Sequence, residues 1–167
     1  MNKVIHVSLN EASINKAIQE VKAYKRELKK KTLELVEAMC KRGEEYAIYH
    51  VADHVDSGET LASIVGYREG NKGYIRAGGA AVWLEFGTGV TYNGAAGTSP
   101  HPLGAEWGYT IGTYGEGHGA DPNGWYYPTD DGGVAHTRGI PATLFMWHTK
   151  EELRDDIPAL MKEVFGK

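Results

Sequence analysis

The feature that most constrains this chain is an apolar stripe that runs through its first third. Between Ile14 and Tyr46, apolar residues recur at spacings of three, four and seven, which places them on one face of an α-helix. Asn10 or Ser13 can cap the helix, because their side chains accept hydrogen bonds from the first backbone amides. A helix over residues 10–53 would be on the order of 60 Å long at 1.5 Å per residue. A small domain cannot cover that length, so we expect part of the helix to pack on a neighbouring subunit.

The length and the composition indicate a single domain over residues 1–167 with a polar, water-facing surface. The mean hydropathy is −0.42, and no apolar run approaches the roughly 18 residues of a membrane helix. We therefore expect no membrane contact and no signal peptide. Cys40 is the one cysteine, and its place in the helical pattern favours a buried free thiol in a reducing compartment. Gly43 is a candidate for a bend or an interruption of the helix.

Charge is distributed unevenly along the chain. Residues 16–42 hold nine basic and four acidic side chains, a net charge of +5, whereas the whole chain carries −4. The remainder therefore carries −9. Such an asymmetry suits head-to-tail contacts between copies of the chain. A solvated helix face explains the basic run equally well.

The pattern after the long helix predicts a small antiparallel sheet. Residues 61–67 and 73–77 read as two strands because they are rich in β-favouring residues and flank a turn-rich segment. Residues 4–9 alternate as a further short strand. Residues 80–86 are ambiguous between strand and helix, and we favour a short helix that completes the 61–86 region.

The C-terminal region predicts a return to helix over residues 140–166. A short helix is expected over residues 142–150 and a longer one over 151–165, with Pro158 as a candidate break. The predicted fold class is therefore α+β, with a long N-terminal helix, a small antiparallel sheet, C-terminal helices and a long loop insertion.

The insertion, residues 87–135, has an unusual composition. Up to Gly133 it holds thirteen of the 22 glycines and seven of the aromatic residues. Disordered linkers are poor in aromatics, and loops this long within a domain are usually functional. We interpret the segment as a loop that binds a partner. The candidate contact residues are Trp107, Tyr109, Tyr114, Trp125, Tyr126 and Tyr127.

Motifs that would indicate catalysis are weak. His50 and His54 share a helix face but lack the glutamate of the zinc-protease pattern. His101, His118 and His136, with Asp121, Asp130 or Asp131, match no known ligand spacing. Glu85 is an acidic residue within an apolar run, and such residues more often pair with a cation or cap a backbone than act as catalytic acids. We therefore expect no enzymatic activity and no catalytic, cofactor-binding or metal-binding residues.

Three landmarks, in this order, resemble the head–tail joining (tail-completion, or neck) proteins of long-tailed bacteriophages. The first is the turn from Asp56 to Ile64 after the basic helix, and the second is the run that ends in Glu-Phe-Gly-Thr. The third is a proline-containing turn into an aromatic-bearing helix. Glu59 and Leu144 depart from the family, which usually has arginine and proline there. The residues matched are Asp56, Gly58, Glu85, Phe86, Gly87, Thr88, Pro141 and Phe145.

The resemblance implies a structural virion protein at the head–tail junction, made in the host cytoplasm. Such proteins form homo-oligomeric rings, here expected as a hexamer or dodecamer, around the DNA channel. Their partners are connector proteins of the neck and tail terminator proteins, with non-specific contact to DNA in the channel as a further expectation. No cofactor comes with the family. The alternatives are a minor capsid or tail-tube-associated protein and, from another class, a small metal-dependent hydrolase.

Overall fold

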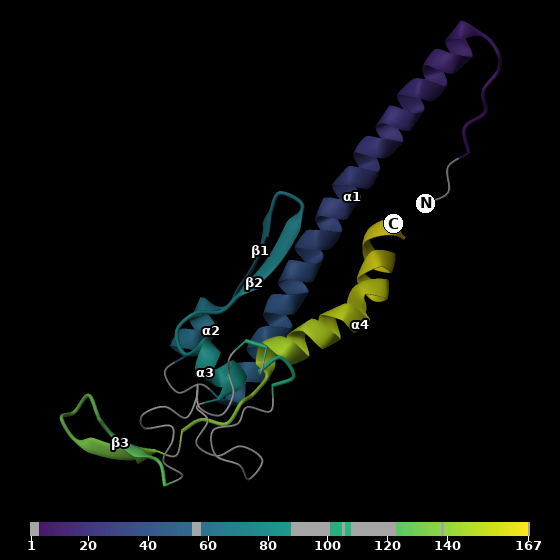
Figure 1. Cartoon of the computed structure of the whole chain (residues 1–167). Helices are drawn as coiled ribbons and strands as arrows, with labels where there is room; N and C mark the ends of the chain where they lie inside the picture. Colours follow the sequence, from purple (N-terminus) through teal and green to yellow (C-terminus); the bar gives the residue numbers. More distant parts are fainter. Residues whose placement is uncertain are drawn as a thin grey trace.

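A computed structural model describes residues 4–54, 58–87, 101–104, 106–107, 123–137 and 139–166. This part of the chain has the expected α+β composition, with long helices at both ends (Figure 1). The helices are α1 (Glu11–Val51), the short 3₁₀ helix η1 (Ala52–His54), α2 (Glu59–Ser63), α3 (Ala81–Phe86) and α4 (Phe145–Phe165). The strands are β1 (Val65–Glu69), β2 (Lys72–Arg76), β3 (Trp125–Pro128) and β4 (Val134–Thr137).

Helix α1 confirms the long apolar stripe. Its cap is Asn10, whose Oδ1 accepts a hydrogen bond from the backbone N of Ser13 at 2.9 Å. The helix runs through Gly43 without interruption. Gly43 is explained by packing, because a Cβ there would lie 2.1 Å from Cδ1 of Ile75 in β2. The glycine therefore allows the sheet to approach the helix closely.

Strands β1 and β2 form an antiparallel hairpin that lies along α1 (Figure 1). Its register pairs Val65 with Arg76 and closes on a turn at Gly70, which has a φ of 60°. Glu44 of α1 accepts a hydrogen bond from the backbone N of Gly66 at 2.6 Å. A Cβ on Gly66 would lie 2.1 Å from the backbone oxygen of Cys40, so this strand too needs glycine where it touches the helix.

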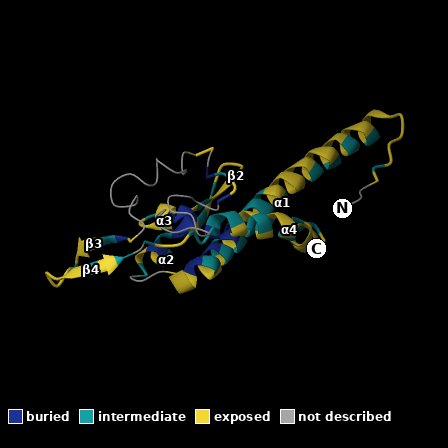
Figure 2. Ribbon diagram, turned by 60° about the horizontal axis from the view of Figure 1, so that its bottom comes forward, coloured by how far each residue is buried: buried dark blue, intermediate teal, exposed yellow. Residues whose placement is uncertain are grey.

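Helix α4 runs antiparallel to the second half of α1. It starts at the core, where Phe145 is fully buried, and near its end the oxygen of Val164 accepts a hydrogen bond from Lys31 Nζ at 2.9 Å. The hydrophobic core sits where the end of α1 meets α2, α3 and the start of α4, the dark blue region of Figure 2. Its buried residues are Ala47, Val51, Ile64, Ala81, Leu84 and Phe145.

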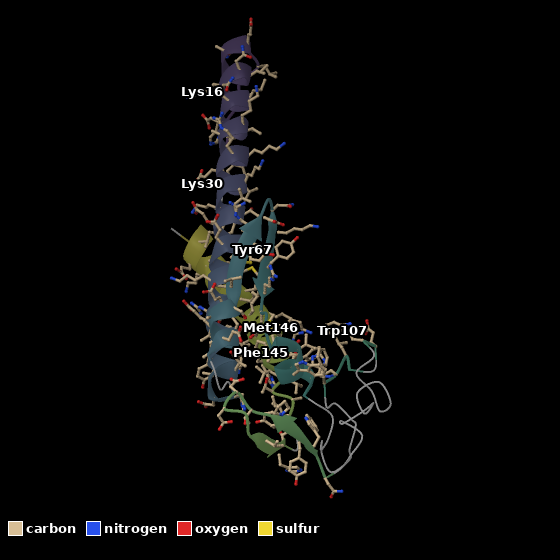
Figure 3. The ribbon with its side chains drawn as sticks, turned by 90° about the vertical axis from the view of Figure 1, so that its left-hand side faces the viewer. Lys16, Lys30, Tyr67, Trp107, Phe145 and Met146 are labelled. Atoms are coloured by element: carbon tan, nitrogen blue, oxygen red, sulfur yellow. The ribbon has the colours of Figure 1, made fainter. Side chains whose placement is uncertain are left out.

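The first half of α1 projects beyond this body, as Figures 1 and 3 show. We call residues 11–30 the arm. Its apolar positions remain exposed, at 42% for Ile14, 44% for Ile18, 53% for Val21 and 40% for Leu28. The helical stripe thus continues onto a surface that the described part of the chain leaves open to solvent.

Several predicted element boundaries were wrong. Residues 4–8 form no regular structure, and the expected first strand of the sheet begins as helix α2 and becomes β1 only at Val65. The end of the insertion is a β-hairpin rather than a loop.

The two expected C-terminal helices are one helix, and residues 142–144 precede it. Pro158 does not split α4, and residues on both sides of it contact α1, Asp156 through Arg42 and Val164 through Lys31. Figure 1 instead shows α4 changing direction along its length, as an internal proline usually causes.

Candidate functional site

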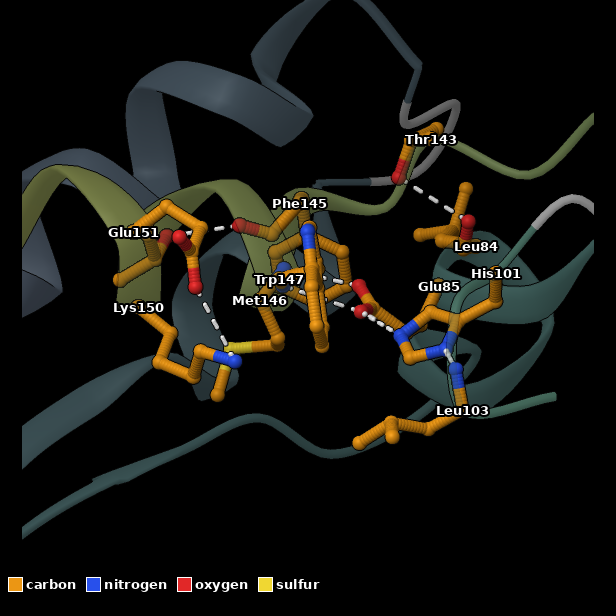
Figure 4. Close-up of polar contacts among 11 residues, drawn as sticks. Leu84, Glu85, His101, Leu103, Thr143, Phe145, Met146, Trp147, Lys150 and Glu151 are labelled. Carbon is orange, nitrogen blue, oxygen red and sulfur yellow. Dashed lines mark hydrogen bonds and ion pairs between the residues drawn. The ribbon is translucent and has the colours of Figure 1, made fainter. Parts of the chain in front are cut away.

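Glu85, near the end of α3, caps helix α4. Its carboxylate accepts hydrogen bonds from the backbone N of Met146 at 2.8 Å and of Trp147 at 3.0 Å (Figure 4). These are the amides that a polar side chain at the helix cap normally satisfies. The capping position here is Leu144, which has no polar side chain and a φ of 55°. Glu85 therefore supplies, from another helix, the side-chain acceptor that Leu144 lacks.

We call this contact between Glu85 and the start of α4 the Glu85 joint. Backbone hydrogen bonds strengthen it. The backbone N of Thr143 donates to the oxygen of Leu84 at 2.7 Å, and that of Leu144 donates to the oxygen of Glu85 at 3.3 Å. The hydroxyl of Thr143 also donates to the oxygen of Leu84, at 2.9 Å. The structure thus brings together two of the motifs identified in the sequence, one around Glu85 and one running from Pro141 to Phe145.

His101 is the third partner of the Glu85 carboxylate, at 2.9 Å from Nε2 to Oε1. Its Nδ1 accepts a hydrogen bond from the backbone N of Leu103 at 3.0 Å. An imidazole that accepts at Nδ1 and faces a carboxylate with Nε2 is the neutral tautomer with its hydrogen on Nε2. Both residues are buried, with 6% of each exposed. The carboxylate thus accepts from three donors of its own chain.

Aromatic rings surround this histidine. The ring centre of Phe86 lies 4.4 Å from that of His101, and those of Trp147 and Trp107 lie at 5.5 and 5.8 Å. Lys150 Nζ lies 3.5 Å from the ring centre of Trp147, a cation–π contact. The cluster holds the short described segment around His101 against α3 and α4.

A groove of about 530 Å³ opens beside the cluster. It lies between the β1–β2 hairpin, α3 and the start of α4, and Figure 3 shows Tyr67, Met146 and Trp107 around this region. Its walls are mainly apolar, while Arg76 and Lys150 contribute basic side chains, Lys150 paired with Glu151 at 3.1 Å. The main apolar wall residues are Tyr74, Val82, Phe86, Trp107, Met146 and Trp147.

The β3–β4 hairpin projects from the opposite end of the molecule to the arm (Figures 1 and 2). Its register pairs Tyr126 with His136 and Pro128 with Val134, so these four side chains share one face. Tyr126 and Val134 are each 71% exposed. Within the described residues, neither strand makes more than slight contact with another helix or strand.

The structure separates the predicted partner-binding residues into two places. Trp107, 56% exposed, borders the groove, whereas Trp125, Tyr126 and Tyr127 lie on β3. Tyr109 and Tyr114 lie outside the described residues, as do Asp56 and Thr88. Gly58 has a φ of 72° and precedes α2, and Gly87 has a φ of 78° and ends α3.

The sequence-based candidates for a metal site are not assembled in the described residues. No group of three histidine, cysteine or acidic side chains there has the geometry to hold a metal ion. Nε2 of His50 lies 3.1 Å from Oε1 of Glu152, at an angle that forms no hydrogen bond. His118 and Asp121 lie outside the described residues.

The alternative interpretation of Glu85, as a backbone cap, is confirmed. The role of His101 was missed, because a contact between residues 16 apart in an irregular segment leaves no periodic signal. Lys150 and Arg76 were missed as well, since each is an ordinary surface cation in the sequence.

No protein-family model matches this chain, and comparisons with curated proteins and with solved structures give no match either. None of the described helices is both long enough and apolar enough to cross a membrane.

Proposed function

We propose that this protein is a structural component of the head–tail junction of a long-tailed bacteriophage and assembles with copies of itself into a ring around the DNA channel. The observation that carries this proposal is the arm. Four apolar residues at helical spacing stay 40–53% exposed on a helix that extends beyond its own core. Burying such a stripe on a neighbouring molecule is the usual outcome for a surface of this kind.

The placement of the open surfaces supports a head-to-tail mode of assembly. The arm and the β3–β4 hairpin lie at opposite ends of the molecule (Figures 1 and 2). Contacts between two different surfaces of identical subunits repeat from copy to copy, and they close into a ring when the rotation permits. The basic arm and the acidic remainder of the chain favour the same arrangement.

The Glu85 joint gives a ring subunit the rigidity that this role needs. It locks α3, the segment around His101 and α4 into one unit through buried hydrogen bonds. A subunit that transmits load between a head and a tail must keep its surfaces in fixed relative positions.

Electron microscopy of the purified protein tests the proposal. Class averages are expected to show closed rings with a central opening. Monodisperse monomers at high concentration, with no binding to neck connector or tail terminator proteins, would contradict it. Labelled antibody on intact particles should mark the neck, whereas label on the capsid or along the tube would favour a minor capsid or tube-associated role.

A further inference from the structure

We propose that the outer face of the β3–β4 hairpin of one copy binds in the groove between β2, α3 and α4 of a second copy. This inference rests on the proposed self-assembly and specifies one of its contacts. We define the outer face as Tyr126, Pro128, Val134 and His136, which the strand register places on one side of the hairpin.

One face of the hairpin is left open by the described part of the chain. A two-stranded hairpin on its own is marginally stable in water and usually requires a third strand or a helix against one face. Here Tyr126 and Val134 are each 71% exposed, and the hairpin makes only slight contact with other described elements. Its outer face is therefore an apolar surface that its own described chain does not cover.

The groove offers a matching surface. Its volume is about 530 Å³. Tyr74, Val82 and Trp147 line it, and aromatic and aliphatic walls of this kind accept aromatic and β-branched side chains. Among the described residues, none from the hairpin lines the groove, so a hairpin that binds there would belong to a second copy.

Charge selects the hairpin over the arm as the occupant. The groove carries Arg76 and also Lys150, which is paired with Glu151 at 3.1 Å. Arg76 is therefore the main positive charge, and the arm, with Lys16, Lys22 and further lysines, would bring like charges to it. The hairpin turn carries Asp130 and Asp131. The pKa of Asp131 is lowered, because its carboxylate accepts hydrogen bonds first from Thr129 and then from the backbone of Gly133. Aspartates are ionised at neutral pH, so the turn is negative and complements the groove.

A mixing experiment tests the pairing directly. One variant, Val82→Glu, puts a charge in the groove at a side chain that is already 45% exposed. The other, Y126A/V134A, removes the outer face. Sedimentation velocity should show self-association of the wild type and at least tenfold weaker association of each variant alone. An equimolar mixture should associate more strongly than either variant alone, because it brings together one intact hairpin and one intact groove.

The mixture also controls for folding, since a misfolded variant could not pair with the other. Val65→Glu is the matched control, because Val65 is 43% exposed and lies outside the groove. This variant should assemble as the wild type does. Assembly of Val82→Glu at wild-type strength, or a mixture that stays monomeric, would overturn the pairing.

Charge reversal tests the complementarity between the hairpin turn and the groove. Arg76→Glu and Asp130→Lys should each weaken self-association, and the double variant should recover at least part of the loss. A double variant weaker than either single one would refute the charge complementarity. If rings form unchanged in all of these variants, the hairpin assignment fails while the head–tail role stands. If the wild type shows no self-association at all, both proposals fail.

Discussion

Oε2 of Glu85 accepts a hydrogen bond at 2.8 Å from the backbone N of Met146, a residue in another helix. The Trp147 amide and His101 complete the set of donors to this carboxylate. The start of α4 therefore depends on a buried side chain from α3, because the side chain of Leu144 at the capping position has no acceptor.

Replacing Glu85 should destabilise the fold strongly. Glu85→Ala leaves buried amides and the His101 N–H without an acceptor, and hydrogen bonds to charged groups contribute about 1.5–3 kcal/mol each. We expect a loss of about 3 kcal/mol in the free energy of unfolding, measured with urea. Glu85→Gln keeps one acceptor and should lose less. Glu45→Ala, in an exposed pair with Arg42, is the control and should lose under about 1 kcal/mol.

The Glu85–His101 contact should appear as an energetic coupling. In a double-mutant cycle, residues that share a buried hydrogen bond couple by about 0.5–3 kcal/mol. We expect Glu85→Gln and His101→Gln together to cost less than the sum of the two single losses. Additive losses within about 0.3 kcal/mol would show that the two side chains act independently. Tryptophan fluorescence is a suitable probe, because Trp107 and Trp147 contact the His101 ring.

The sequence predicts those parts of the fold in which the apolar pattern repeats over many residues. The stripe in α1 repeats over many turns, so its helix could be located to within a few residues. The β3–β4 hairpin was missed although Trp125, Tyr126 and Tyr127 favour strands and Gly132 marks a turn. These signals were hidden in a segment whose overall glycine content indicates a loop.

Short segments and distant contacts explain the remaining errors. Thr60 and Leu61 fit either a helix or a strand, and tertiary packing selects the helix. The kind of role that Glu85 plays could be predicted, because a buried acid needs donors. Its particular donors depend on how Phe145 enters the core, and no local pattern encodes that arrangement.

Gly43→Ala should destabilise the protein although it places a better helix former in α1. Helix propensity alone predicts a gain of about 1 kcal/mol. The new Cβ would lie 2.1 Å from Cδ1 of Ile75, and overpacking of a core typically costs about 1–3 kcal/mol. The steric cost of the new Cβ should therefore exceed the gain in helix propensity. In an Ile75→Val background, which lacks that Cδ1, the same substitution should cost less, and an equal cost in both backgrounds would contradict this explanation.

The hydrogen bond of Tyr46 predicts that the folded protein loses stability in alkaline solution. Its hydroxyl donates to Oδ2 of Asp156 at 2.6 Å, and this hydrogen bond is the main reason that the pKa of Tyr46 is raised from 10.0. A pKa that is higher in the folded state stabilises the fold below the unfolded value, and this contribution is lost as the pH rises through the folded value. The wild type should lose stability relative to Tyr46→Phe above about pH 10. Parallel stability curves from pH 8 to 11 would contradict the prediction.

The arm should contribute to assembly and not to the stability of the subunit. Ile18 and Val21 are 44% and 53% exposed, so Ile18→Glu and Val21→Glu should leave the melting temperature nearly unchanged. Full burial of such a side chain at an interface contributes about 1.5–3 kcal/mol, so each variant should weaken self-association roughly tenfold or more. Ala23→Glu is the matched control, because it adds the same charge on the opposite side of the helix. Equal association of all three variants in sedimentation equilibrium would show that charge alone, and not the apolar stripe, governs the contact.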